Sequence, residues 1–213
     1  MTKNTADENA ALASRIDAFY NGGAFGKRAK LCDSADDILH YCIYAKAWND
    51  AMQYERCVTN SKIVPNRDLI TRKLENELKN NLSYIENDFD AWHREMCVDT
   101  SYGMRCGVWQ KLINMSFKYI YCARVKKDML AQFDGVFAHC HCPIDSKIAE
   151  RILKLMNEAD ARYGLIKSVS ISGATNWNNI DYEQYSSFQS VVNELAANEN
   201  LTALEFDFVH WEK

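Results

Sequence analysis

The sequence predicts a mainly α-helical fold, with one compact domain over residues 1–213 that forms a bundle of about six or seven helices. Only two of the 213 residues are proline, so strong helix breakers are scarce. Apolar residues recur at steps of three and four over long stretches, which is the period of an amphipathic helix. These two observations favour a helical bundle over a β-sandwich or a barrel.

Three helices are predicted in the first half of the chain, over residues 5–22, 34–52 and 68–97. A Ser or Thr followed three residues later by an acidic residue marks the start of the first two, and a pair of glycines ends the first. The third has the clearest apolar stripe. We expect it to break or bend at Asn80-Asn81.

The second half is predicted to contain three further helices. Residues 105–127 have an apolar face so broad that it indicates a central, well-buried helix. Pro143 suits the first turn of the next helix, and Asp181 begins the last one with the spacing of a capping box. Residues 165–172 alternate weakly, as in a short strand, and residues 201–211 are predicted to be a strand or an extended segment. The two can pair as one short two-stranded element.

Composition and the chain start indicate a soluble cytoplasmic protein without a membrane partner. No apolar run reaches the roughly 18 residues that a transmembrane helix needs. The first residues are polar and lack the plan of a signal peptide. The eight cysteines are spread over a long chain, so we expect them to be reduced and mostly buried.

Charge is distributed unevenly, although the net charge is only −4. Residues 105–127 hold six basic residues and no acidic one, together with several aromatic rings. Cations neutralise phosphates and rings stack on bases, so this helix is the predicted contact surface for a nucleic acid, a nucleotide or an acidic protein. The predicted ligand-binding residues are Lys111, Asn114, Lys118, Tyr121, Arg105 and Arg124.

Two other interpretations of these basic residues remain open. The lysines can solvate the outer face of a core helix. Alternatively, they can pair with the C-terminal segment 168–213, which has seven acidic residues and one lysine.

The run His139-Cys140-His141-Cys142 is the most unusual local feature, because imidazole and thiolate are the ligands that zinc prefers. Alternate residues of the run can reach one ion, whereas four consecutive residues cannot. His93 and Cys97 share a helix face and can supply a second pair. The predicted zinc site is Cys140, Cys142, His93 and Cys97.

The run has two further interpretations. It can be a loop that leads into the helix at Pro143, with Cys142 near the helix start and Asp145 in the first turn, where a carboxylate favours the helix dipole. It can also hold a cysteine nucleophile, since a helix N-terminus lowers the pKa of a thiol such as Cys142.

The leading functional hypothesis is a non-catalytic intracellular binding or regulatory protein that uses the helix 105–127. The competing hypothesis is an enzyme acting on a nucleic acid or nucleotide, with Lys111 or Lys118 on phosphate and Asp145, Asp181 or the His-Cys run for chemistry. A third is a scaffold domain with a structural zinc. None of the common hydrolase, zinc-protease or dinucleotide motifs is present.

Overall fold

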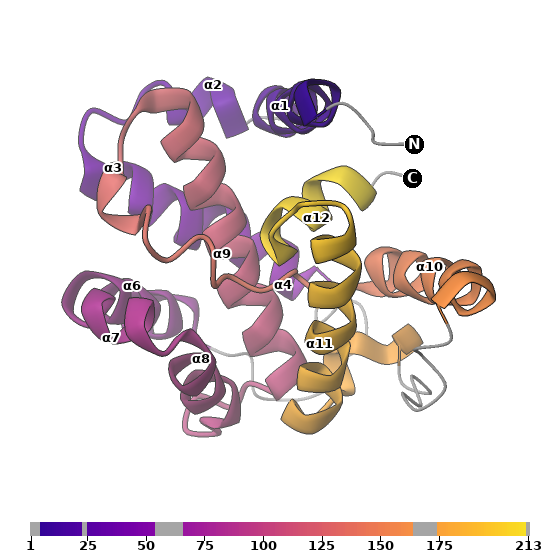
Figure 1. Ribbon diagram of the computed structural model, residues 1–213. Coiled ribbons are helices and arrows are strands. Elements are labelled where there is room, and N and C mark those ends of the chain that lie inside the picture. The colour runs from indigo at the N-terminus through magenta and orange to yellow at the C-terminus, as the bar shows by residue number, and fades with distance from the viewer. Residues whose placement is uncertain (1–4, 23–24, 54–65, 164–173, 212–213) are drawn as a thin grey trace.

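The computed structural model describes residues 5–22, 25–53, 66–163 and 174–211, which are mostly helical and contain no strand (Figure 1). The helix α9 (Cys106–Lys127) runs through the middle of the molecule. The helices before it are α1 (Thr5–Asn21), α2 (Phe25–Ala29), α3 (Ala35–His40), a π-helical stretch (Tyr41–Ala47), α4 (Trp48–Met52), α6 (Arg67–Asn80), α7 (Leu82–Asn87) and α8 (Phe89–Val98). Those after it are α10 (Ser146–Tyr163), α11 (Tyr182–Asn198) and α12 (Ala203–His210), with short 3-10 turns at Ala131–Phe133 and Ala174–Asn179.

The helical fold class is confirmed, but the chain forms more and shorter helices than the six or seven predicted. The predicted helix over 68–97 accounts for part of the difference, because it divides into α6, α7 and α8. The first break is at Asn81, as expected. The second is at Asp88, whose side chain accepts a hydrogen bond from the N–H of Ala91 at 3.1 Å and so starts a new helix.

The C-terminal segment corrects a second prediction. Residues 201–211 were expected to be extended, but α12 occupies most of them. Thr202 and Glu205 form a capping box at its start. This helix is buried on nearly all sides, so its sequence lacks the one-sided period by which a helix is recognised. The proposed partner segment, 165–172, lies outside the described residues.

The core surrounds α9. Sixteen of its 22 residues are buried, which confirms the prediction of a central helix. One apolar cluster joins α9 to the N-terminal helices and to α6–α8, and a second lies among α10, α11 and α12. None of the described helices is long and apolar enough to cross a membrane.

Candidate functional site

The predicted contact face of α9 is buried inside the protein. Lys111, Asn114 and Lys118 are 5%, 1% and 2% exposed. Neighbouring helices pack against this face as well as against the apolar stripe. The interpretation that the lysines solvate an outer face is therefore wrong for these residues. Contact between them and an external ligand stays a prediction that this geometry does not favour.

The buried polar groups of this face have partners within the chain. Lys111 Nζ lies 2.6 Å from Asp145 Oδ2, and Lys118 forms an ion pair with Asp207. Tyr121 donates a hydrogen bond of 2.9 Å to Glu205 Oε1. Lys118 and Tyr121 thus pair with acidic residues of the C-terminal segment, in line with one of the open interpretations.

The basic residues toward the two ends of α9 are paired as well. Arg105 donates to the side chain of Asn179, and Arg124 bridges two aspartates. Lys126 pairs with Asp17. Lys127 donates to two backbone carbonyls, that of Ala29 at the end of α2 and that of Cys32 just after it. These side chains therefore do not form an unpaired basic patch.

The segment 140–145 is an irregular strap held by side-chain amides. Gln189 accepts from the N–H of Cys142 at 3.1 Å and donates to its carbonyl at 2.7 Å. Gln110 makes the equivalent pair with Ile144, at 3.3 and 2.9 Å. Buried backbone groups outside regular structure need such partners. The two glutamines therefore explain how the strap crosses the interior.

The strap leads into α10, although not at the predicted residue. The helix begins at Ser146 rather than at Pro143. Asp145 precedes it, and its side chain accepts a hydrogen bond of 3.0 Å from the N–H of Ile148. Asp181 has the same role before α11. Both carboxylates proposed for catalysis are thus helix caps, which was their simpler explanation.

The four predicted zinc ligands are not gathered around a common point. His93 and Cys97 do meet, with 3.5 Å between His93 Nδ1 and Cys97 Sγ. The thiols of Cys140 and Cys142 instead face the carbonyls of Val136 and Pro143. Among the described residues, no group of three or more His, Cys, Asp or Glu side chains could hold a metal ion.

The surroundings of Cys142 do not favour its interpretation as a nucleophile. The residue is fully buried and does not lie at a helix start. Burial raises the pKa of its thiol well above the usual value. A nucleophilic cysteine needs the opposite shift.

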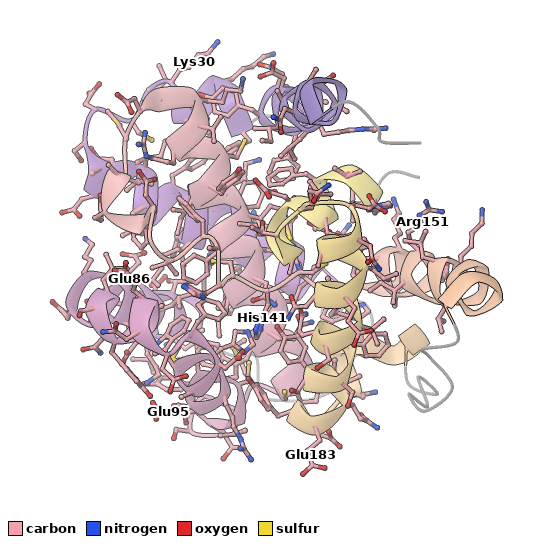
Figure 2. All side chains as sticks on the ribbon, in the orientation of Figure 1. Lys30, Glu86, Glu95, His141, Arg151 and Glu183 are labelled. Carbon is pink, nitrogen blue, oxygen red and sulfur yellow. The ribbon has the colours of Figure 1, made fainter. Side chains whose placement is uncertain are left out.

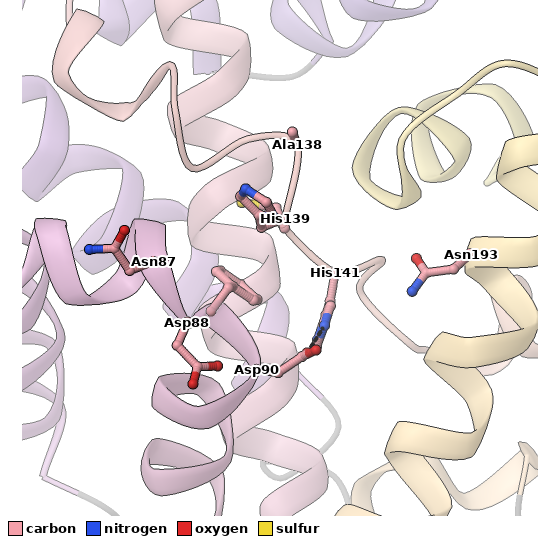
Figure 3. Close-up of a pocket in the computed structure, with 9 residues that line it drawn as sticks. Asn87, Asp88, Asp90, Ala138, His139, His141 and Asn193 are labelled. Atoms are coloured by element: carbon pink, nitrogen blue, oxygen red, sulfur yellow. Dashed lines mark ion pairs between the residues drawn. The ribbon is translucent and has the colours of Figure 1, made fainter.

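A surface pocket of about 330 Å³ lies where three segments meet, at the junction of α7 and α8, at residues 138–141, and on α11 (Figure 3). Its lining residues are Asn87, Asp88, Phe89, Asp90, Ala138, His139, Cys140, His141 and Asn193. Most of these carry polar side chains, and none is a lysine or an arginine. Three of the four residues of the unusual His-Cys run thus line this pocket.

Asp90 and His141 form the best-defined contact in the pocket. Asp90 Oδ1 lies 2.7 Å from His141 Nε2, although the Asp90 side chain is 82% exposed. This hydrogen bond holds the pKa of Asp90 below its usual value. Asp90 is therefore an ionised hydrogen-bond acceptor, and its contact with His141 orients the carboxylate toward the segment 138–141.

The imidazole of His141 is fixed from the inner side by Tyr185. His141 Nδ1 lies 2.8 Å from Tyr185 Oη, which accepts a hydrogen bond of 2.7 Å from Asn114 Nδ2. Asn114 Oδ1 in turn lies 3.1 Å from His93 Nε2. His141 is buried, and Figure 2 shows it near the middle of the view, between α9 and α11. A continuous hydrogen-bonded chain therefore joins the pocket to the core.

Sequence reasoning found His141, His93 and Asn114 but missed Asp90, Tyr185 and the two glutamines. A usable signal was present. Gln110 and Asn114 are four residues apart on a helix predicted to be buried, and so are Tyr185 and Gln189 on the last helix. Polar pairs at this spacing in apolar helices indicate a buried network.

Comparisons with protein-family models, with curated proteins and with solved structures found no match.

Proposed function

We propose that the protein is a non-catalytic binding protein and that its ligand site is the pocket beside Asp90 rather than the face of α9. The supporting observation is the fixed Asp90 carboxylate. It is open to solvent on one side, ionised, and held at 2.7 Å by a histidine that is itself anchored in the core. Preorganised polar groups of this kind are typical of specific binding sites.

The lining chemistry favours a ligand that donates hydrogen bonds and carries positive charge. Asp88 and Asp90 contribute carboxylates, while Asn87 and Asn193 contribute amide oxygens. A phosphate would meet negative charge here with no lysine or arginine to balance it. A small amine or guanidinium group fits this site better than the nucleic acid or nucleotide expected from the sequence.

The hydrogen-bond partners of His141 favour a binding site over acid–base catalysis. A general base needs a nitrogen within reach of the substrate proton. One ring nitrogen of His141 faces Asp90 and the other faces Tyr185, so neither is turned to the open side of the pocket. The imidazole thus supports Asp90 and is not placed to exchange protons with a ligand.

An NMR titration tests this function with three small probes: methylguanidinium, its neutral isostere methylurea, and inorganic phosphate. We expect methylguanidinium to shift the backbone resonances of residues 87–90, 138–141 and 193, and to bind more tightly than methylurea. Asp90→Asn should weaken the binding of methylguanidinium by about tenfold, since a hydrogen bond to a charged group contributes about 1.5 kcal/mol or more to the binding free energy.

Asp36→Asn is the matched control, because Asp36 is an exposed carboxylate outside the pocket that pairs with Lys79. It should leave the titration unchanged. Saturable shifts with phosphate alone, or no shift at these residues with any probe, would contradict the proposal.

A further inference from the structure

The chain of hydrogen bonds behind the pocket has a direction that can be read from one backbone group. The carbonyl oxygen of Cys142 can only accept a hydrogen bond, and it lies 3.3 Å from Asn114 Nδ2. This contact fixes which end of the Asn114 amide carries the hydrogens. The amide oxygen of Asn114 must therefore be the atom that faces His93.

The orientation of Asn114 sets the proton on His93. Asn114 Oδ1 accepts, so His93 Nε2, at 3.1 Å, carries the hydrogen. His93 Nδ1 is then free to accept from the thiol of Cys97 at 3.5 Å. Burial first, and the neighbouring imidazole of His141 second, lower the pKa of His93 well below its usual value. Its ring is therefore neutral, which agrees with this assignment.

Tyr185 transmits the direction to the pocket. Its hydroxyl oxygen accepts from Asn114 Nδ2 at 2.7 Å and faces the protonated His93 Nε2 at 3.3 Å. The remaining polar neighbour is His141 Nδ1 at 2.8 Å, so the tyrosine hydrogen points there. His141 Nδ1 thus accepts, and Nε2 carries the hydrogen that is donated to Asp90.

We infer that Asn114 is a positioning residue for the pocket: its amide sets the polarity of the chain Asn114–Tyr185–His141–Asp90, so that His141 accepts a hydrogen bond at Nδ1 and donates one from Nε2. The ligand class rests on the proposed function, but this protonation pattern does not. Asn114 was expected to touch a ligand from the outer face of α9. It acts instead from behind the pocket, through two side chains.

Other rings pack around the imidazole of His141. The ring centroid of His93 lies 4.9 Å away, and those of Phe89 and Tyr185 lie at 5.0 and 5.7 Å. Asp90 on α8 is the anion in direct contact with His141, and the basic residues of α9 are bound to other partners.

Histidine ¹⁵N NMR tests the inference without any ligand. In the wild-type protein at neutral pH, we expect unprotonated Nδ1 and protonated Nε2 for both His93 and His141. Asn114→Asp replaces the donor with an acceptor of the same shape. Tyr185 should then donate to the new carboxylate and accept from His141, so that His141 Nδ1 becomes protonated.

Gln189→Glu is the matched control, because it makes the same buried change on the other side of the strap without touching Tyr185 or His141. The inference is overturned if His141 is protonated on Nδ1 in the wild type, if Asn114→Asp leaves it unchanged, or if Gln189→Glu switches it equally. Should Asn114→Asp not fold, the wild-type pattern decides. A wild-type pattern as expected, with no methylguanidinium binding, would reject only the proposed function.

Discussion

Lys118 and Asp207 form an ion pair that is closed to solvent and joins α9 to α12. Their side chains are only 3% and 2% exposed. Lys118 Nζ also lies 4.6 Å from the ring centroid of Phe19 and 4.7 Å from that of Phe208. The pair therefore connects the N-terminal helix, the central helix and the C-terminal helix at one point.

Removing one member of this pair should destabilise the protein strongly. Asp207→Ala leaves the Lys118 ammonium buried without a counter-charge, which typically costs about 3–5 kcal/mol. Urea denaturation measures the loss. The double variant Lys118→Met with Asp207→Leu removes both charges and should recover most of it. A single variant that loses under about 1 kcal/mol, or a double variant as unstable as the single, would contradict this view.

The Asp145 carboxylate should contribute stability that is lost in acid. Burial would raise its pKa, but Lys111 and the N–H of Ile148 outweigh burial and hold that pKa below the usual value. A depressed folded pKa contributes stability above the unfolded value of about 3.9 and loses it as the pH falls through the folded value. Between pH 5 and pH 3, the urea midpoint of the wild type should therefore fall more than that of Asp145→Asn.

The Asp145→Asn variant isolates the charge, because asparagine also caps a helix. Asp36→Asn, at a carboxylate that is 76% exposed, is the control and should keep the wild-type pH dependence. Equal slopes for the wild type and Asp145→Asn would show that Asp145 is not the group responsible.

The sequence predicted the features that depend on neighbouring residues. The helical class, the central position of 105–127, the break at Asn81 and the cap at Asp181 all follow from spacings of three or four residues. The start of α10 was misplaced because proline is compatible with a first turn but does not require one.

The candidate site could not be predicted in the same way, because its contacts join residues far apart in the chain. His141 and Tyr185 are separated by 44 residues, and Lys111 and Asp145 by 34. Local periodicity shows that Lys111 lies opposite the apolar stripe, but not that another helix covers it. The charges of residues 168–213 did allow the pairing of Lys118 with that segment as one alternative.

Two glycines should respond differently to alanine. A Cβ at Gly107 would lie 2.1 Å from the carbonyl oxygen of Trp177, which is backbone and cannot move aside. A Cβ at Gly135 would lie 2.0 Å from the carboxylate of Glu86, which is the end of a flexible exposed side chain. Gly107→Ala should therefore cost about 1–3 kcal/mol and Gly135→Ala about 0.5 kcal/mol or less. Urea denaturation of the two variants measures these losses in the free energy of unfolding. Equal losses would contradict the close contact between Gly107 and the backbone of Trp177.

Cysteine reactivity gives the sharpest test of the two interpretations of Cys142. Burial raises the thiol pKa of Cys140 and Cys142. Cys106 is partly exposed, and hydrogen bonding to Cys97 lowers its pKa. Since the thiolate is the reactive form, a short iodoacetamide pulse should label Cys106 at least about tenfold faster than Cys142.

Peptide mass spectrometry reads out this labelling, and two controls define its meaning. Cys106→Ser should abolish labelling at this position and leave the slow labelling of Cys142 unchanged. Labelling in urea should bring the two rates close together, since the difference comes from the folded environment. Rapid labelling of Cys142 in the folded protein would overturn the description of the strap as closed, and would return that thiol to consideration as a nucleophile. Slow labelling leaves the strap a structural element, with His141 as the residue that it presents to the pocket.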